Sequence, residues 1–278
     1  MKMKSQVEVP VIGQGTWMMG DPADRAREVE TVRTGIDLGL THIDTAEMYG
    51  DGSAEEMIGE AIAGRPRDQL FIVSKVLPQH ASRAGTIKAC EASLRRLRTD
   101  YVDVYLLHWR GSHPLEETFA GMQQLLGAGK IRALGVSNFD LDDMEEAVDL
   151  LGDTPLACNQ VLYHLGERYA DARLLPFCQQ HNIALCAYSP FGHGRFPGPT
   201  SKGGRVLAAI AERHRATPRQ VALAFLVRQS PLFTIPKASS VAHVTENAGA
   251  LTLALSADEI AAVEEAFPVR TDGGLPML

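Results

Sequence analysis

The sequence predicts an α/β protein built as a single (β/α)8 barrel. Eight short runs of β-branched and apolar residues recur along the chain, and amphipathic helical patterns fill the intervals between them. Strands that alternate with helices form a parallel sheet, and eight such units suit a closed TIM barrel better than an open sheet. An open doubly wound sheet usually carries a GxGxxG motif after its first strand, and GQGTWMMG at residues 13–20 lacks it.

The length of the chain agrees with this fold. A chain of 278 residues is close to the ~250 residues typical of one barrel, so we expect one domain over residues 1–278. The expected strands are VIGQGT at 11–16, THIDT at 41–45, LFIVSK at 70–75, YVDVYLLH at 101–108, RALGVSN at 132–138, LACNQ at 156–160, IALCAYS at 183–189 and LFTIPK at 232–237.

The helices between these strands carry start and stop signals. Gly39 follows the first helical pattern and is placed to end that helix. Ser53 and Glu56 match a capping box at the start of the second helix, and Ser256 and Glu259 match one at the start of the last helix. In such a barrel the active site lies at the C-terminal rim of the strands.

Composition limits the partners and the location. The net charge of −7 argues against nucleic acid and anionic membranes as partners. The four cysteines form no CxxC pair and lie in apolar elements, which is typical of reduced core thiols in a cytoplasmic protein. No apolar run approaches the ~20 residues that span a bilayer, and no apolar segment typical of a signal peptide follows the N-terminus. A monomer is the simplest oligomeric state.

Four polar residues at the rim suit the reduction of a carbonyl group. Asp44 and Lys75 end the second and third expected strands, His108 ends the fourth, and Tyr49 follows Asp44 in its loop. A ketone or aldehyde that receives a hydride needs a proton on its oxygen, which a phenol can donate. We expect Lys75 to lower the pKa of Tyr49, Asp44 to keep Lys75 charged, and His108 to orient the substrate oxygen.

Five motifs at these positions resemble the aldo-keto reductases. They are HIDTAEMYG, Lys75 closing LFIVSK, LLHW, GKIRALGVSNF and IPKASSVAHVTEN, in this order along nearly the whole chain. The family is a (β/α)8 barrel that reduces aldehydes and ketones with a nicotinamide cofactor, usually NADPH. The resemblance implies that Asp44, Tyr49, Lys75 and His108 form the catalytic tetrad.

The resemblance also implies the residues that bind cofactor and substrate. The nicotinamide carboxamide would meet Ser137, Asn138 and Gln160, and its ring would stack on Tyr188. The whole expected cofactor set comprises Thr16, Trp17, Ser137, Asn138, Gln160, Tyr188, Ser189, Pro190, Phe191, Gly192, Ile235, Lys237, Ser239, Ser240, His243, Glu246 and Asn247. The expected substrate set comprises Trp17, Met18, Tyr49, His108, Trp109 and Phe139.

The sequence departs from the family pattern at two places, which change the expected cofactor preference and the expected shape of the pocket. His243 stands where the family often has an arginine, six positions after Lys237, and a guanidinium binds phosphate better than an imidazole does. With Lys237, Ser239 and Ser240 still present, we expect a modest preference for NADPH over NADH. The long C-terminal loop of many relatives looks short in this sequence, whose last residues are VRTDGGLPML, so we expect an open pocket for small-molecule carbonyl substrates.

Two other functions are compatible with a barrel. A metal-dependent hydrolase needs clustered ligands, and the nine histidines show no HxH or HExxH spacing, so we expect no metal site. A cofactor-binding barrel with a regulatory or scaffold role and little turnover is the alternative to an enzyme, and it has no need of the four rim residues together.

Overall fold

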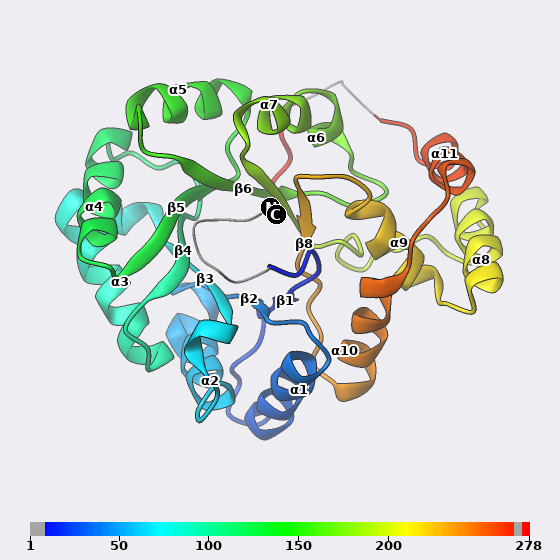
Figure 1. The fold of residues 1–278 in the computed structure, drawn as a ribbon, viewed down its shortest axis with the longest axis horizontal. Helices are drawn as coiled ribbons and strands as arrows, with labels where there is room; N and C mark the ends of the chain where they lie inside the picture. Colours follow the sequence, from blue (N-terminus) through cyan, green and yellow to red (C-terminus); the bar gives the residue numbers. More distant parts are fainter. Residues whose placement is uncertain (1–8, 270–273) are drawn as a thin grey trace.

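The computed structural model describes residues 9–269 and 274–278. Its eight strands lie in one sheet in chain order, and each is parallel to the next. Parallel bridges from Ile12 to Thr234 and from Gly15 to Lys237 join the first strand to the region of the last, which closes the barrel that Figure 1 shows end-on. The predicted (β/α)8 barrel is therefore confirmed. The strands are β1 (Gln14–Gly15), β2 (His42–Asp44), β3 (Phe71–Val76), β4 (Val102–Leu107), β5 (Ile131–Ser137), β6 (Leu156–Leu162), β7 (Ala184–Tyr188) and β8 (Leu232–Thr234).

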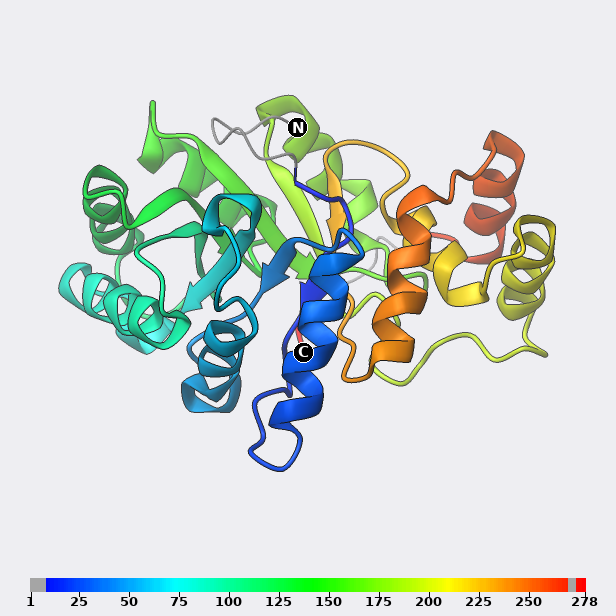
Figure 2. The ribbon, with the colours of Figure 1, turned by 60° about the horizontal axis from the view of Figure 1, so that its bottom comes forward.

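Helices surround the sheet, and Figures 1 and 2 show them as an outer layer around the strands. They are α1 (Arg25–Asp37), α2 (Ser53–Ala61), α3 (Arg83–Leu97), α4 (Leu115–Gly127), α5 (Leu141–Leu151), α6 (Tyr169–Ala172), α7 (Leu174–His181), α8 (Lys202–His214), α9 (Pro218–Leu226), α10 (Val241–Ala248) and α11 (Ala257–Ala266). Short 3₁₀ turns are η1 (Tyr49–Gly52), η2 (Arg67–Gln69), η3 (Pro78–His80) and η4 (Gly249–Thr252). None of the helices in the described ranges is long and apolar enough to cross a membrane.

Successive residues of a strand alternate between two apolar cores. On β3, Phe71 and Val73 belong to the core inside the barrel, whereas Ile72 and Val76 belong to the core between sheet and helices. This period of two follows from the pleat of a strand. It predicts that Lys75 shares the inner face with Val73, while Ser74 faces the helices.

The capping signals are confirmed at one helix and wrong at another. Ser256 and Glu259 form the predicted capping box of α11. At α2 the N-cap is Gly52, and no side chain caps the helix, because Ser53 is already in helical conformation. Gly39 adopts φ 92° directly after the C-cap of α1, as expected for a glycine that ends a helix. The four cysteines are free and buried. The assignment of the full range 1–278 to one domain stays a prediction.

Candidate active site

A buried lysine connects the four rim residues. The Lys75 ammonium donates to Asp44 Oδ2 at 2.8 Å, to the Thr45 carbonyl at 2.9 Å and to the Tyr49 hydroxyl at 3.2 Å. Its three N–H groups therefore all have partners, and its side chain has no exposed surface. The Tyr49 and His108 rings pack edge to face, with centroids 5.8 Å apart. The structure thus brings the predicted tetrad together.

The position of Tyr49 depends on an unusual turn. Gly50 and Asp51 in η1 both adopt left-handed conformations, with φ of 56° and 52°. Such a conformation costs free energy at the non-glycine residue and persists only where the surroundings hold it. The turn brings the Tyr49 ring back over Lys75, so that a loop tyrosine is only 8% exposed.

Burial and the lysine charge set the protonation states at the rim. Burial alone would lower the pKa of Lys75, but Asp44 and Tyr49 outweigh it and raise the pKa above its usual value. Burial, with the Lys75 charge, lowers the pKa of His108 to about 2, so its imidazole is neutral. Burial raises the pKa of Tyr49, and Lys75 only partly counteracts it. Lys75 thus lowers the pKa of Tyr49 as expected, but burial, which the sequence did not reveal, outweighs it and leaves that pKa above its usual value.

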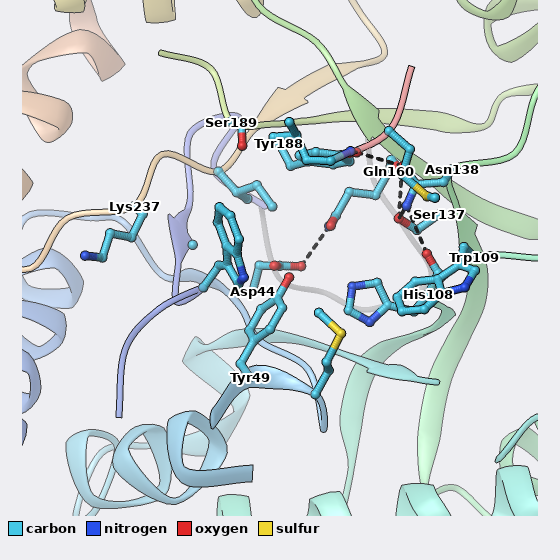
Figure 3. Close-up of a pocket in the computed structure, with 16 residues that line it drawn as sticks. Asp44, Tyr49, His108, Trp109, Ser137, Asn138, Gln160, Tyr188, Ser189 and Lys237 are labelled. Carbon is cyan, nitrogen blue, oxygen red and sulfur yellow. Dashed lines mark hydrogen bonds between the residues drawn. The ribbon is translucent and has the colours of Figure 1, made fainter. Parts of the chain in front are cut away.

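Amides and a tyrosine surround the tetrad on one side. Gln160 donates to Asp44 Oδ1 at 2.7 Å, so both carboxylate oxygens have partners. Asn138, in a left-handed conformation with φ 61°, donates to the His108 carbonyl at 3.0 Å and accepts from the Tyr188 hydroxyl at 2.9 Å. Figure 3 shows these groups on the wall of the cavity opposite Tyr49.

A cavity of about 970 Å³, counting its open mouth, lies over the tetrad. Of the predicted site residues, Trp17, Asp44, Tyr49, His108, Trp109, Ser137, Asn138, Gln160, Tyr188, Ser189, Ile235 and Lys237 line it. Sequence reasoning missed Gly15, Met48, Met277 and Leu278 on its wall. Met48 directly precedes Tyr49, so its place in the sequence indicates that it lies near the site. No sequence pattern indicates that Met277 and Leu278 line the cavity.

Among the predicted contact residues that do not line the cavity, three lie in the segments after β1 and β5. Phe139 has no exposed surface and packs in the core between sheet and helices, since the chain turns at Asn138. Met18 is 69% exposed and is not among the residues that line the cavity. Thr16 is buried, and its hydroxyl donates to the Asp44 carbonyl at 2.9 Å. Phe139 as a substrate contact is therefore wrong in this structure, because its side chain is fully buried in the core, whereas Met18 stays a prediction. Thr16 supports the strand that carries Asp44.

The cavity is less open than the sequence predicted, because the C-terminal residues cover one of its edges. Met277 and Leu278 line the cavity, and the Leu278 amide donates to the Tyr188 hydroxyl at 3.4 Å. Figures 1 and 2 both place the last residue near the barrel axis. Two apolar side chains thus narrow the space beside Tyr188.

The expected phosphate-binding segment lies between β8 and α10. Lys237 is exposed, and Figure 3 shows its side chain pointing away from Tyr49. Ser240 caps α10 by accepting from the His243 amide at 3.3 Å. Arg27 of α1, which the sequence did not single out, donates to the Ser239 carbonyl at 3.1 Å. Cations from two elements therefore flank the start of α10.

The other predicted cofactor residues lie near this segment but outside the cavity wall. Phe191 packs on Phe196 at 5.8 Å between centroids, and Glu246 accepts from the Thr217 hydroxyl at 2.7 Å. Asn247 is buried in α10. The remaining ones are Pro190 and Gly192, in the loop after β7. Across residues 9–269 and 274–278, no three His, Cys, Asp or Glu side chains group so as to hold a metal ion.

The barrel and its buried Lys–Tyr–Asp cluster define an oxidoreductase-type site that donates a proton to a carbonyl oxygen. Comparison with known proteins agrees with this class. The model of the Aldo/keto reductase family matches residues 11–267, and the chain belongs to this family.

Relatives and solved structures are similar over almost the full length. Methylglyoxal reductase YeaE of Escherichia coli (strain K12) is 49% identical, over 96% of this chain and 94% of its own. Glyoxal reductase of Bacillus subtilis (strain 168) is 34% identical, over 93% of this chain and 89% of its own. An aldo-keto reductase from Klebsiella pneumoniae, solved in complex with NADPH, is 47% identical with a TM-score of 0.90, over 97% of this chain and 95% of its own.

Proposed function

We propose that this protein uses NADPH to reduce small aldehydes, with 2-oxoaldehydes such as methylglyoxal as the leading substrate class. The observation that carries the proposal is the bond from buried Lys75 to the Tyr49 hydroxyl at 3.2 Å, on the wall of a cavity. Relatives named for the reduction of methylglyoxal and glyoxal support the substrate class. The apolar side chains of Met48, Met277 and Leu278 on the cavity wall favour a small substrate.

Each of the four rim residues has a separate role in the transfer of a proton to the carbonyl oxygen. Tyr49 carries its proton at neutral pH, because its pKa is raised, and it donates that proton to the carbonyl oxygen. Lys75 stabilises the phenolate that remains, and Asp44 holds Lys75 charged and in place. His108 is neutral, so it orients the carbonyl by an N–H bond and is not the proton source. NADPH, when bound, supplies the hydride.

The cavity fits a nicotinamide cofactor at both of its ends. The Tyr188 ring and the amides of Asn138 and Gln160 lie on the wall next to the tetrad, as a flat heteroaromatic ring with a carboxamide requires. At the other end, Lys237 and the capped N-terminus of α10 provide a cation and backbone donors for a phosphate. Arg27 adds a positive charge near the start of α10, but Asp24 forms an ion pair with Arg27 at 2.8 Å and offsets part of that charge. The preference for NADPH over NADH is therefore modest.

A steady-state assay tests the proposal. The measurement is kcat/KM for NADPH oxidation with methylglyoxal, glyoxal, an aromatic aldehyde and a bulky ketone. The proposal expects turnover with all aldehydes and the highest kcat/KM for the two dicarbonyls. Absence of turnover with every carbonyl, with NADPH binding intact, would favour the regulatory alternative.

A further inference from the structure

Helix α2 begins directly after the turn that holds Tyr49, and ion pairs join both of its ends to neighbouring elements. Near its N-terminal end, Glu55 pairs with Arg96 of α3 at 2.6 Å. Near its C-terminal end, Glu60 pairs with Arg25 of α1 at 2.9 Å. The Glu55 side chain has no exposed surface, whereas that of Glu60 is 36% exposed. The mechanism above uses neither pair.

The pair of Glu55 with Arg96 is hydrogen-bonded to β3, the strand that carries Lys75. Glu55 Oε1 accepts from the Ser74 hydroxyl at 2.5 Å, and its Oε2 accepts from Arg96 Nε. Ser74 immediately precedes Lys75 on β3, and the two side chains lie on opposite faces of the strand. Glu55 therefore contacts the residue that directly precedes Lys75, and it lies in the helix that follows Tyr49.

The same arginine also supports the turn itself. Gly52 ends η1 with φ 94°, and a Cβ at Gly52 would lie 2.5 Å from Arg96 Cδ and 2.6 Å from Arg96 Nε. The arginine side chain thus packs directly against the backbone of the turn. Two left-handed residues precede Gly52, so the turn needs such external support to persist.

Stability alone does not explain a charged group at this place. The Glu55 carboxylate is fully buried, and its loss of hydration offsets much of what the ion pair contributes to stability. An ion pair with hydrogen-bond geometry also restricts the relative positions of the elements that carry its two partners. Here the geometry that it specifies is the distance between the Tyr49 turn and β3.

We propose that Glu55, Arg96 and Ser74 form a positioning clamp that sets the distance between the Tyr49 hydroxyl and the Lys75 ammonium. The clamp rests on the proposed role of Tyr49 as proton donor. None of the three residues lines the cavity over the tetrad. They act by fixing the turn, the helix and the strand relative to one another. A displacement of the reacting groups by about 1 Å can reduce a rate on the order of 10²-fold.

The test compares variants of this clamp with controls on the same helix. The clamp variants are Glu55→Gln, Arg96→Met and Ser74→Ala. Glu60→Gln removes the ion pair to Arg25 at the other end of the helix, and Ile58→Val removes a methyl group from the buried core and lowers stability. For each variant we would measure the thermal midpoint, the Kd for NADPH, the single-turnover rate of reduction, and the solvent deuterium isotope effect on that rate.

The clamp predicts a specific pattern. Glu55→Gln and Arg96→Met should reduce the single-turnover rate about 10–100-fold with the Kd changed less than about two-fold, because only the proton donor is displaced. The solvent isotope effect should increase, since proton transfer becomes the slower part of the step. Ser74→Ala, which keeps the ion pair, should lie between these variants and the wild type. Both controls should lower the midpoint and leave rate and isotope effect unchanged.

Two results would overturn the clamp. One is a rate loss that follows the thermal midpoint equally in clamp and control variants. The other is an unchanged rate and isotope effect in Arg96→Met and Ser74→Ala, which stay informative if Glu55→Gln does not fold. Tyr49→Phe, run alongside, separates this failure from that of the proposed function: an inactive Tyr49→Phe with active clamp variants rejects the clamp alone.

Discussion

Replacing Lys75 by methionine removes the cation and keeps a side chain of similar length. The change leaves Asp44 buried with only Gln160 as a partner, and it leaves the Thr45 carbonyl without its donor. Breaking a buried pair from one side costs ~3–5 kcal/mol. At roughly 2 °C for each kcal/mol in a chain of this size, the thermal midpoint should fall by roughly 6–10 °C.

The same change should reduce proton transfer from Tyr49. An opposite charge at this distance shifts a pKa by ~1–3 units, and each unit corresponds to ~1.4 kcal/mol. Without Lys75 the phenolate loses that stabilisation, so the single-turnover rate should fall about 10–10³-fold. The assay is stopped-flow absorbance of the nicotinamide during one turnover, below the thermal midpoint of the variant.

A double variant, Asp44→Leu with Lys75→Met, separates stability from chemistry. Replacing both charges by apolar groups should recover much of the lost stability, although the Gln160 amide is left unpaired at a cost of ~1–3 kcal/mol. The rate should not recover. If the rate recovered together with the thermal midpoint, Lys75 would act through stability alone, and its proposed role in stabilising the Tyr49 phenolate would be wrong.

Three further predictions concern the anchor, the pH dependence and the cofactor. Asp44→Asn should slow turnover less than Lys75→Met does, because the lysine remains; a larger loss, measured by single turnover, would give Asp44 a direct chemical task. The single-turnover rate should be constant between roughly pH 6 and 9 and fall only as pH rises through the raised pKa of Tyr49, because the Tyr49 hydroxyl must carry its proton to donate it. A fall of the rate around pH 6–7, as expected for an imidazolium that donates the proton, would contradict the assignment of His108 as neutral. Lys237→Ala should remove most of the NADPH preference and His243→Arg should increase it, judged by kcat/KM for both cofactors; unchanged selectivity in Lys237→Ala would mean that the phosphate binds elsewhere.

The sequence predicts the barrel and the tetrad because both depend on local patterns. Short runs of β-branched and apolar residues, separated by helical segments, define eight parallel units, and each tetrad residue lies at or just after a strand end. Parallel strands bring their ends to one rim, so sequence position alone places Asp44, Lys75 and His108 together.

What the sequence misses depends on contacts between distant elements. The pair of Glu55 with Arg96 and the bond from Arg27 to Ser239 join different helices and loops, and no spacing along the chain reveals them. The sequence predicts that Lys75 lowers the pKa of Tyr49, but the larger opposite effect of burial on that pKa becomes visible only in three dimensions. For the same reason, the sequence did not show that the chain turns at Asn138 and carries the next side chain into the core.

The most direct test of the account is single-turnover reduction of methylglyoxal by Tyr49→Phe. The substitution removes the hydroxyl that accepts from Lys75 and keeps the ring that packs against His108. The account predicts an unchanged Kd for NADPH and a rate lower by about 10²–10⁴-fold, the usual contribution of a general acid. A Tyr49→Phe variant that keeps more than about a tenth of the wild-type rate would contradict the assignment of Tyr49 as proton donor.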